Sequence, residues 1–167
     1  MKVRKVVFPV DLAGSSYRIT PKVRSIVDQL DAELHLIYVL ETFEGYNNFF
    51  VPHPSLDLME REDMALTKRH LEEFAEKYFV DRPKTKLVVL HGEPVEQILK
   101  YVESEGIDMI IVAGYDQSLL EKAIFGDISE QIARSSPVPV MVINPFVEEK
   151  TTIPEVGRPA ATHGLVI

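Results

Sequence analysis

The sequence predicts an α/β domain built on a parallel sheet that is covered on both faces. Five short runs rich in Val, Ile and Leu show little strict alternation, which is typical of parallel strands buried on both sides. The runs are residues 3–10, 33–40, 86–90, 109–113 and 138–143. Segments with helical spacing separate them, and this alternation indicates a layered fold with right-handed crossovers. With 167 residues and 46% hydrophobic content, the chain can bury such a core as one domain.

The first three helices are predicted from capping signals and from apolar spacing. The first begins at Thr20, because a capping residue followed by Pro21 is a common helix start. The second spans about residues 57–78, with apolar side chains on one face. The third begins at Pro94, after the run 86–90.

The segment after the run 109–113 combines two glycines with a helix start. Gly114 ends that run, and Gly126 precedes a helix expected to begin at Asp127. The Asp127 side chain is expected to cap this helix, with Glu130 completing a capping box. The free amides and positive dipole end of such a helix point into the crevice at the strand's carboxyl end, which suits an anion.

Composition and charge narrow the compartment and the partners. The chain has no cysteine, so disulfides and thiolate chemistry are excluded. No run approaches the roughly 20 apolar residues that span a bilayer, and the short N-terminal run is expected not to be a secretory leader. The net charge of −8 disfavours nucleic acid and anionic membranes. We therefore expect a cytoplasmic protein whose partners are proteins or small molecules.

Four phrases of the sequence resemble the universal stress protein family, and together they cover about residues 3–144. They are residues 7–11 (Val-Phe-Pro-Val-Asp), 33–39 (Glu-Leu-His-Leu-Ile-Tyr-Val), 92–94 (Gly-Glu-Pro) and 137–142 (Pro-Val-Pro-Val-Met-Val). The resemblance implies an open five-stranded parallel sheet of order 3-2-1-4-5 with helices on both faces, the Rossmann-like fold of adenine nucleotide alpha hydrolases. It also implies a domain over residues 1–144, a C-terminal extension over 145–167, and a crevice between the first and fourth strands.

The resemblance further implies a nucleotide site at the strand ends. The candidate residues are Pro9, Val10, Asp11, Val39, Gly114, Gln117, Gly126, Asp127 and Ile128. In nucleotide-binding relatives the aspartate accepts a hydrogen bond from adenine, and the backbone at the position of Val39 reads the same base. Alternatively, Asp11 stabilises the turn after its strand, and Gly114 supplies a positive φ.

The family's phosphate loop is only partly present. It reads Gly, two residues, Gly, nine residues, Gly and then Ser or Thr, whereas this chain has Gln117 at the middle glycine, a gap one residue shorter, and Asp127 at the hydroxyl position. Like charges about 4 Å apart repel by ~1 kcal/mol in water and ~4 kcal/mol at an effective dielectric of about 20. We therefore expect a degraded site for triphosphates and assign no cofactor or metal. The alternative is that Asp127 binds Mg²⁺ together with ATP or AMP.

No catalytic residues are predicted. His35 lies within a strand and is expected to be a hydrogen-bonded structural residue, whereas His70 lies on a helix with Glu73 three residues on but no second histidine. The serines lack a nucleophile elbow, so covalent hydrolysis is not supported. Weak ATP hydrolysis is the only enzymatic alternative.

The expected function is stress adaptation through protein interaction. Relatives commonly dimerise through the last strand, and residues 138–143 provide an apolar edge for a homodimer. An aromatic segment, residues 43–54, is expected to pack against the crevice, the partner subunit or its own following helix. An ATP- or AMP-binding regulatory switch is the alternative function.

Overall fold

The computed structural model describes residues 2–12, 14–41, 54–114 and 124–146. At residues 14, 15, 54–62 and 124–127 it describes the backbone only. The aromatic segment up to residue 53 and the extension from residue 147 lie outside the described residues. Within the described part, no helix is long and apolar enough to cross a membrane.

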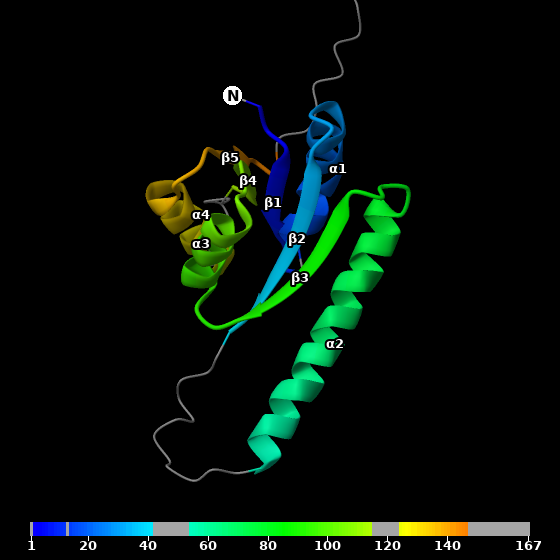
Figure 1. The fold of residues 1–167 in the computed structure, drawn as a ribbon, viewed down its shortest axis with the longest axis vertical. Coiled ribbons are helices and arrows are strands. Elements are labelled where there is room, and N and C mark those ends of the chain that lie inside the picture. Colours follow the sequence, from blue (N-terminus) through cyan, green and yellow to red (C-terminus); the bar gives the residue numbers. More distant parts are fainter. Residues whose placement is uncertain (1, 13, 42–53, 115–123, 147–167) are drawn as a thin grey trace, which may run out of the picture.

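Strands and helices alternate along the chain (Figure 1). They are β1 (Lys5–Pro9), α1 (Gly14–Gln29), β2 (Glu33–Leu40), α2 (Pro54–Phe79), β3 (Thr85–His91), α3 (Pro94–Glu105), β4 (Met109–Ala113), α4 (Ile124–Ser135) and β5 (Val140–Ile143). The five strands form one parallel sheet of order β3-β2-β1-β4-β5. The predicted fold class and strand order are confirmed.

Each face of the sheet carries its own core, which explains why the strands are apolar throughout. On one face, Phe8 of β1 and Leu36 of β2 pack with α1 and α2. On the other face, Val7 and Ile37 from the same two strands pack with α3 and α4. Burying one such side chain stabilises the fold by about 1.5–3 kcal/mol. Apolar and polar residues therefore do not alternate along these strands.

The first helix begins six residues before the predicted start at Thr20. Helix α1 begins at Gly14, and Pro21 lies inside it. The earlier turn is held by burial, because Ser16 and Ile19 are fully buried. The Thr20 hydroxyl donates a hydrogen bond to the Ser16 carbonyl at 2.6 Å instead of capping the helix. The capping prediction for Thr20 is therefore wrong.

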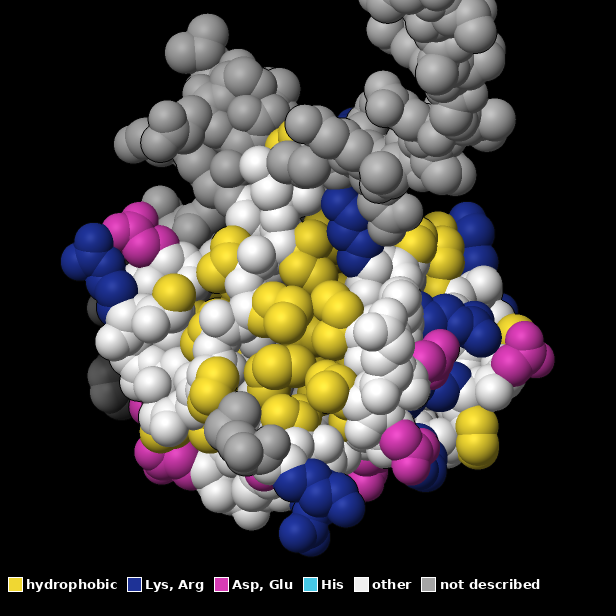
Figure 2. Space-filling view, turned by 90° about the horizontal axis from the view of Figure 1, so that it is seen from above, with side chains coloured by type: hydrophobic (Ala, Val, Ile, Leu, Met, Phe, Trp, Pro, Cys, Tyr) yellow, Lys and Arg dark blue, Asp and Glu magenta, His cyan; other side chains and the backbone are white. Residues whose placement is uncertain are grey.

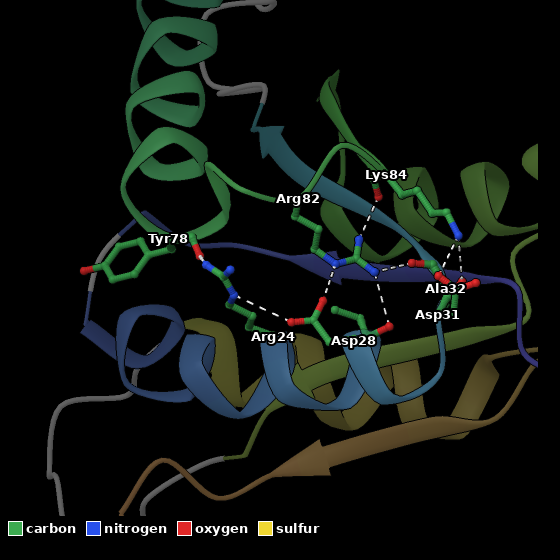
Figure 3. Close-up of polar contacts among 8 residues, drawn as sticks. Arg24, Asp28, Asp31, Ala32, Tyr78, Arg82 and Lys84 are labelled. Atoms are coloured by element: carbon green, nitrogen blue, oxygen red, sulfur yellow. Dashed lines mark hydrogen bonds and ion pairs between the residues drawn. The ribbon is translucent and has the colours of Figure 1, made fainter.

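The end of α1 is joined to the turn between α2 and β3 by Arg82 (Figure 3). Its side chain is only 7% exposed. The guanidinium donates hydrogen bonds to Asp28 Oδ1 at 2.9 Å and to the Lys84 carbonyl at 2.7 Å. It also donates to the carbonyls of Val27 and Ala32, which lie at the end of α1 and just after it. One side chain thus joins the end of α1 to the residues just before β2 and β3.

Candidate functional site

The candidate site lies between β1 and β4, where the order in which the strands follow one another across the sheet reverses. The paired residues of these strands are only Val6 with Met109 and Val7 with Ile110. Beyond them β1 follows β2, where the Val10 amide donates to the Ile37 carbonyl at 2.8 Å. In contrast, β4 follows β5 up to Ala113. The two strands therefore part toward their carboxyl ends, where ligands of open α/β sheets bind.

Asp11 lies in the turn that joins β1 to α1. Its backbone amide donates to the hydroxyl oxygen of the fully buried Ser16 at 2.9 Å. The next residue, Leu12, has a φ of 51°, so the chain turns sharply at this point. Pro9 and Val10 are buried and position the turn from the end of β1. The Ser16 side chain therefore holds the backbone of this turn. In the sequence, the only indication of this role was a hydroxyl residue shortly after the strand.

Gly114 is required by close packing and not by its backbone angle. Its φ is not among the positive values, which contradicts one of the two alternatives for this residue. A Cβ added here would lie 3.3 Å from Val142 Cγ1 and 3.4 Å from the Ile143 carbonyl oxygen. The Gly114 amide also donates to that carbonyl at 2.7 Å. The glycine therefore lets the end of β4 lie against the end of β5.

Helix α4 begins at Ile124, so Gly126 and Asp127 lie in its first turn and not before it. The predicted capping role of Asp127 is wrong for this reason. Glu130 does not complete a capping box either, because its carboxylate pairs with Arg134 at 2.6 Å. An acidic residue in the first turn still lies at the positive end of the helix dipole.

The beginning of α4 is attached to the end of β4 by Ser129. Its hydroxyl donates to the Ala113 carbonyl at 2.9 Å, and the side chain is 5% exposed. The preceding residue, Ile128, is 8% exposed and packs into the core with α3. The Ile128 side chain therefore holds the beginning of α4 against the core next to the site. Sequence reasoning missed Ser129, because its partner carbonyl lies 16 residues away.

The remaining candidate residues are placed less directly. Val39 lies in β2, paired with Leu90 of β3, and is half-buried against the core beneath α3. Gln117 lies outside the described residues. Thus the ends of β1 and β4 and the first turns of α1 and α4 meet at the parting strands.

The histidines of the described part belong to no metal-binding group. The residues described include no group of three His, Cys, Asp or Glu side chains that could hold a metal ion. His70 is exposed, and the neighbouring Glu73 pairs with Arg69 at 3.8 Å. His35 is 1% exposed, and its Nδ1 lies 2.9 Å from the Tyr101 hydroxyl. This agrees with the structural role expected for His35.

Comparison with known proteins shows the family of this chain. The model of the universal stress protein family matches residues 2–144. Universal stress protein MJ0531 of Methanocaldococcus jannaschii is 24% identical over 147 residues, which cover 84% of this chain and 81% of that protein. Stress response protein NhaX of Bacillus subtilis is 31% identical over 97 residues, or 56% of this chain and 58% of that protein.

Three solved structures share the fold. Hypothetical protein MJ0577 superposes with a TM-score of 0.69 at 21% identity, covering 86% of this chain and 97% of its own. A universal stress protein in complex with cAMP has a TM-score of 0.60 at 16% identity, covering 87% and 99%. A universal stress protein from Archaeoglobus fulgidus in complex with dAMP has a TM-score of 0.51 at 12% identity, covering 86% and 100%.

Proposed function

Because the chain belongs to the universal stress protein family of the stress response, we propose that it acts in stress adaptation as a homodimer that works through protein interaction. We further propose that its nucleotide site disfavours triphosphates. The observation that carries the homodimer is the apolar edge formed by β5, and the one that disfavours triphosphates is Asp127 in the first turn of α4.

The β5 edge is apolar and accessible. Val142 is 53% exposed and Met141 37% exposed, although both lie within a strand. Figure 2 looks down on this side of the molecule and shows hydrophobic side chains gathered at its centre, with charged side chains toward the rim. An unpaired edge of this kind favours pairing with another strand, and a second copy offers an identical one.

Sedimentation at micromolar concentration tests the homodimer. We expect the unaltered protein to sediment as a dimer and Val142→Lys as a monomer, because a charge buried in a strand interface without a partner is costly. Leu66→Lys is the matched control, since Leu66 is equally exposed but lies on α2. An unaltered protein that sediments only as a monomer refutes the homodimer.

The charge of the α4 first turn supports the reduced affinity for triphosphates. Where the family has Ser or Thr, this chain carries Asp127, and the helix dipole attracts either that carboxylate or a phosphate. A triphosphate brings several charges to the same amides, so its repulsion exceeds that of a monophosphate. The site is therefore poorly suited to ATP.

Binding of an adenine nucleotide with less charge is the second candidate function. Two observations favour it: β1 and β4 part at the position where ligands bind this kind of sheet, and structures of similar fold are solved with cAMP and dAMP. In this case the protein is a regulatory switch whose dimer responds to AMP or a related ligand.

Calorimetry with ATP and AMP, each with and without Mg²⁺, separates the two proposals. We expect ATP to bind weakly at best, and Asp127→Ser with Gln117→Gly to bind it tighter by about 1–3 kcal/mol, the range for one removed like charge in a partly screened site. Binding of AMP by the unaltered protein establishes the second candidate. Low-micromolar binding of ATP that requires Mg²⁺ and weakens in Asp127→Ser means that Asp127 is a metal ligand, and the proposal of a degraded site is then wrong.

A further inference from the structure

His35 is a buried base in a cluster of charged and titratable groups under α3. It lies in the middle of β2, and its ring meets the Tyr101 ring edge-on at 5.7 Å between centroids. The charged and titratable groups around it come from β2 itself, from its two neighbouring strands and from α3. They are Lys5 of β1, Glu33 of β2, Lys86 of β3, and Tyr101 and Glu105 of α3.

The hydrogen bonds of His35 fix its neutral form. Nε2 lies 3.0 Å from Glu33 Oε1, and a carboxylate can only accept, so Nε2 carries the proton. Nδ1 then accepts from the Tyr101 hydroxyl at 2.9 Å. The neutral ring is therefore fully hydrogen-bonded between the sheet and α3, and both bonds depend on this one tautomer.

Protonation of Nδ1 would reverse the hydrogen bond between His35 and Tyr101. Protonated Nδ1 would donate toward Tyr101, so the Tyr101 hydroxyl must turn its own hydrogen elsewhere. The nearby Lys86 ammonium, 5.7 Å from the Tyr101 ring centroid, is a donor and offers no acceptor. The new positive charge would also lie among Lys86 and Lys5 in a site shielded from water. Glu33 favours the charged ring, but its side chain is 43% exposed and its attraction is screened.

We propose that His35 is an acid-sensitive latch, so that its protonation releases the second half of α3 from the sheet. Tyr101 joins this part of α3 to β2 through the histidine. The end of the helix has two further links to the sheet: Glu105 accepts from Lys86 at 2.8 Å, and its carbonyl accepts from Lys5 Nζ at 2.7 Å. Because α3 shares a core with Ile128 and Ile132 of α4, its release also removes support from the candidate site.

The direction of the pH effect follows from burial. Burial lowers the pKa of His35 from its ordinary value near 6.5, with Glu33 opposing and the two lysines assisting. When α3 opens, water reaches the ring and the pKa returns toward 6.5. Protons therefore favour the open form: the opening constant rises as pH falls below 6.5, by up to about tenfold per pH unit, until the lowered pKa is reached.

The test combines histidine titration by NMR with hydrogen exchange of the full-length protein. We expect the His35 ring to titrate below the ordinary histidine pKa of 6.5. Exchange of the α3 amides, corrected for intrinsic rates, should rise as pH falls from 6.5 to the midpoint of the His35 titration, while that of α1 does not. Glu33→Gln removes the group that favours the charged ring, so it should lower that midpoint and extend the rise in α3 exchange to lower pH. His70→Gln is the control and should change neither.

Three results overturn the proposal. One is a His35 ring that titrates at pH 6.5 or above, and another is α3 exchange that stays flat between pH 6.5 and the midpoint of the His35 titration. The third is a His35→Gln variant that keeps the acid-dependent rise in α3. Glu33→Gln changes a half-exposed side chain, so the test remains decisive if His35→Gln does not fold.

Discussion

Replacing Arg82 with Met should destabilise the protein by ~2–3 kcal/mol, although Arg82 is a charged residue in a connecting turn. Its side chain is 7% exposed and bonds one carboxylate and three carbonyls. A hydrogen bond from a charged donor contributes about 1.5–3 kcal/mol, and a carbonyl left buried without a donor costs about 1–3 kcal/mol. Asp28 is half-exposed and recovers hydration, so the total stays well below the sum of the bonds.

Urea denaturation measures this loss, and a second arginine provides the control. Arg69 pairs with Glu73 on the exposed surface of α2, with 76% of its side chain exposed, so Arg69→Met should change stability by less than about 0.5 kcal/mol. Arg82→Lys should recover only part of the loss, because one ammonium cannot reach Asp28 and the carbonyls on both sides of it. If Arg82→Met matches Arg69→Met, the contacts of Arg82 with the end of α1 and with the residues before β2 and β3 do not stabilise the fold.

Three further substitutions test other parts of the structure. The Asp108 carboxylate accepts hydrogen bonds from the Arg4 and Lys5 amides at 2.8 and 2.9 Å, and these bonds lower its pKa from 3.8. The stabilisation by Asp108 is therefore complete above pH 3.8 and is lost as pH falls through the lowered pKa. Asp108→Asn should therefore reduce stability at neutral pH and flatten the acid branch of a stability-pH curve below pH 3.8. Glu93 caps α3, because its carboxylate accepts hydrogen bonds from two backbone amides. Glu93→Ala should therefore lower the free energy of unfolding, measured by urea denaturation, by about 1 kcal/mol. An unchanged free energy of unfolding would mean that this cap does not stabilise the fold. Gly114→Ala places a Cβ 3.3 Å from Val142 Cγ1, so we expect a loss of about 1–3 kcal/mol, and unchanged stability would contradict the close packing of β4 on β5.

The fold was predictable from the sequence because its main signals are local and repeated. The extents of β2 and β4 and the start of α3 at Pro94 agree with the prediction, since uniform apolar runs and a proline after a capping residue act over a few residues. Resemblance to the family supplied the strand order. Periodicity alone does not contain this order, because strand pairing joins segments far apart in the chain.

Both wrong helix starts came from residues that are good caps by type. Thr20 and Asp127 lie inside longer helices, and in α1 the burial of Ser16 and Ile19 holds the turn before Thr20 in place. Tertiary packing outweighs a capping preference of about 1 kcal/mol.

The contacts that sequence reasoning did not find connect residues distant in sequence. Arg82 and Asp28 are 54 residues apart, and Ser129 bonds a carbonyl 16 residues earlier. Single residues of these types carry no signal for such partners. The packing requirement at Gly114 was likewise hidden, because the residues it contacts belong to the next strand, 28 or more positions later.

The short pairing of β1 with β4 has a consequence for the order of folding. In the part of the chain that the structure describes, β1 and β4 share only two paired positions. Beside them the Asp108 carboxylate accepts the Lys5 amide, which lies 103 residues away in sequence. Closing so long a loop is entropically unfavourable, and only a few bonds compensate for it at this point. We expect the segment from β1 to β3 and the segment from β4 to β5 each to collapse on its own helices first and the two to join late. Substitutions at Asp108 should then accelerate unfolding while leaving the rate of initial collapse unchanged, as stopped-flow kinetics can measure.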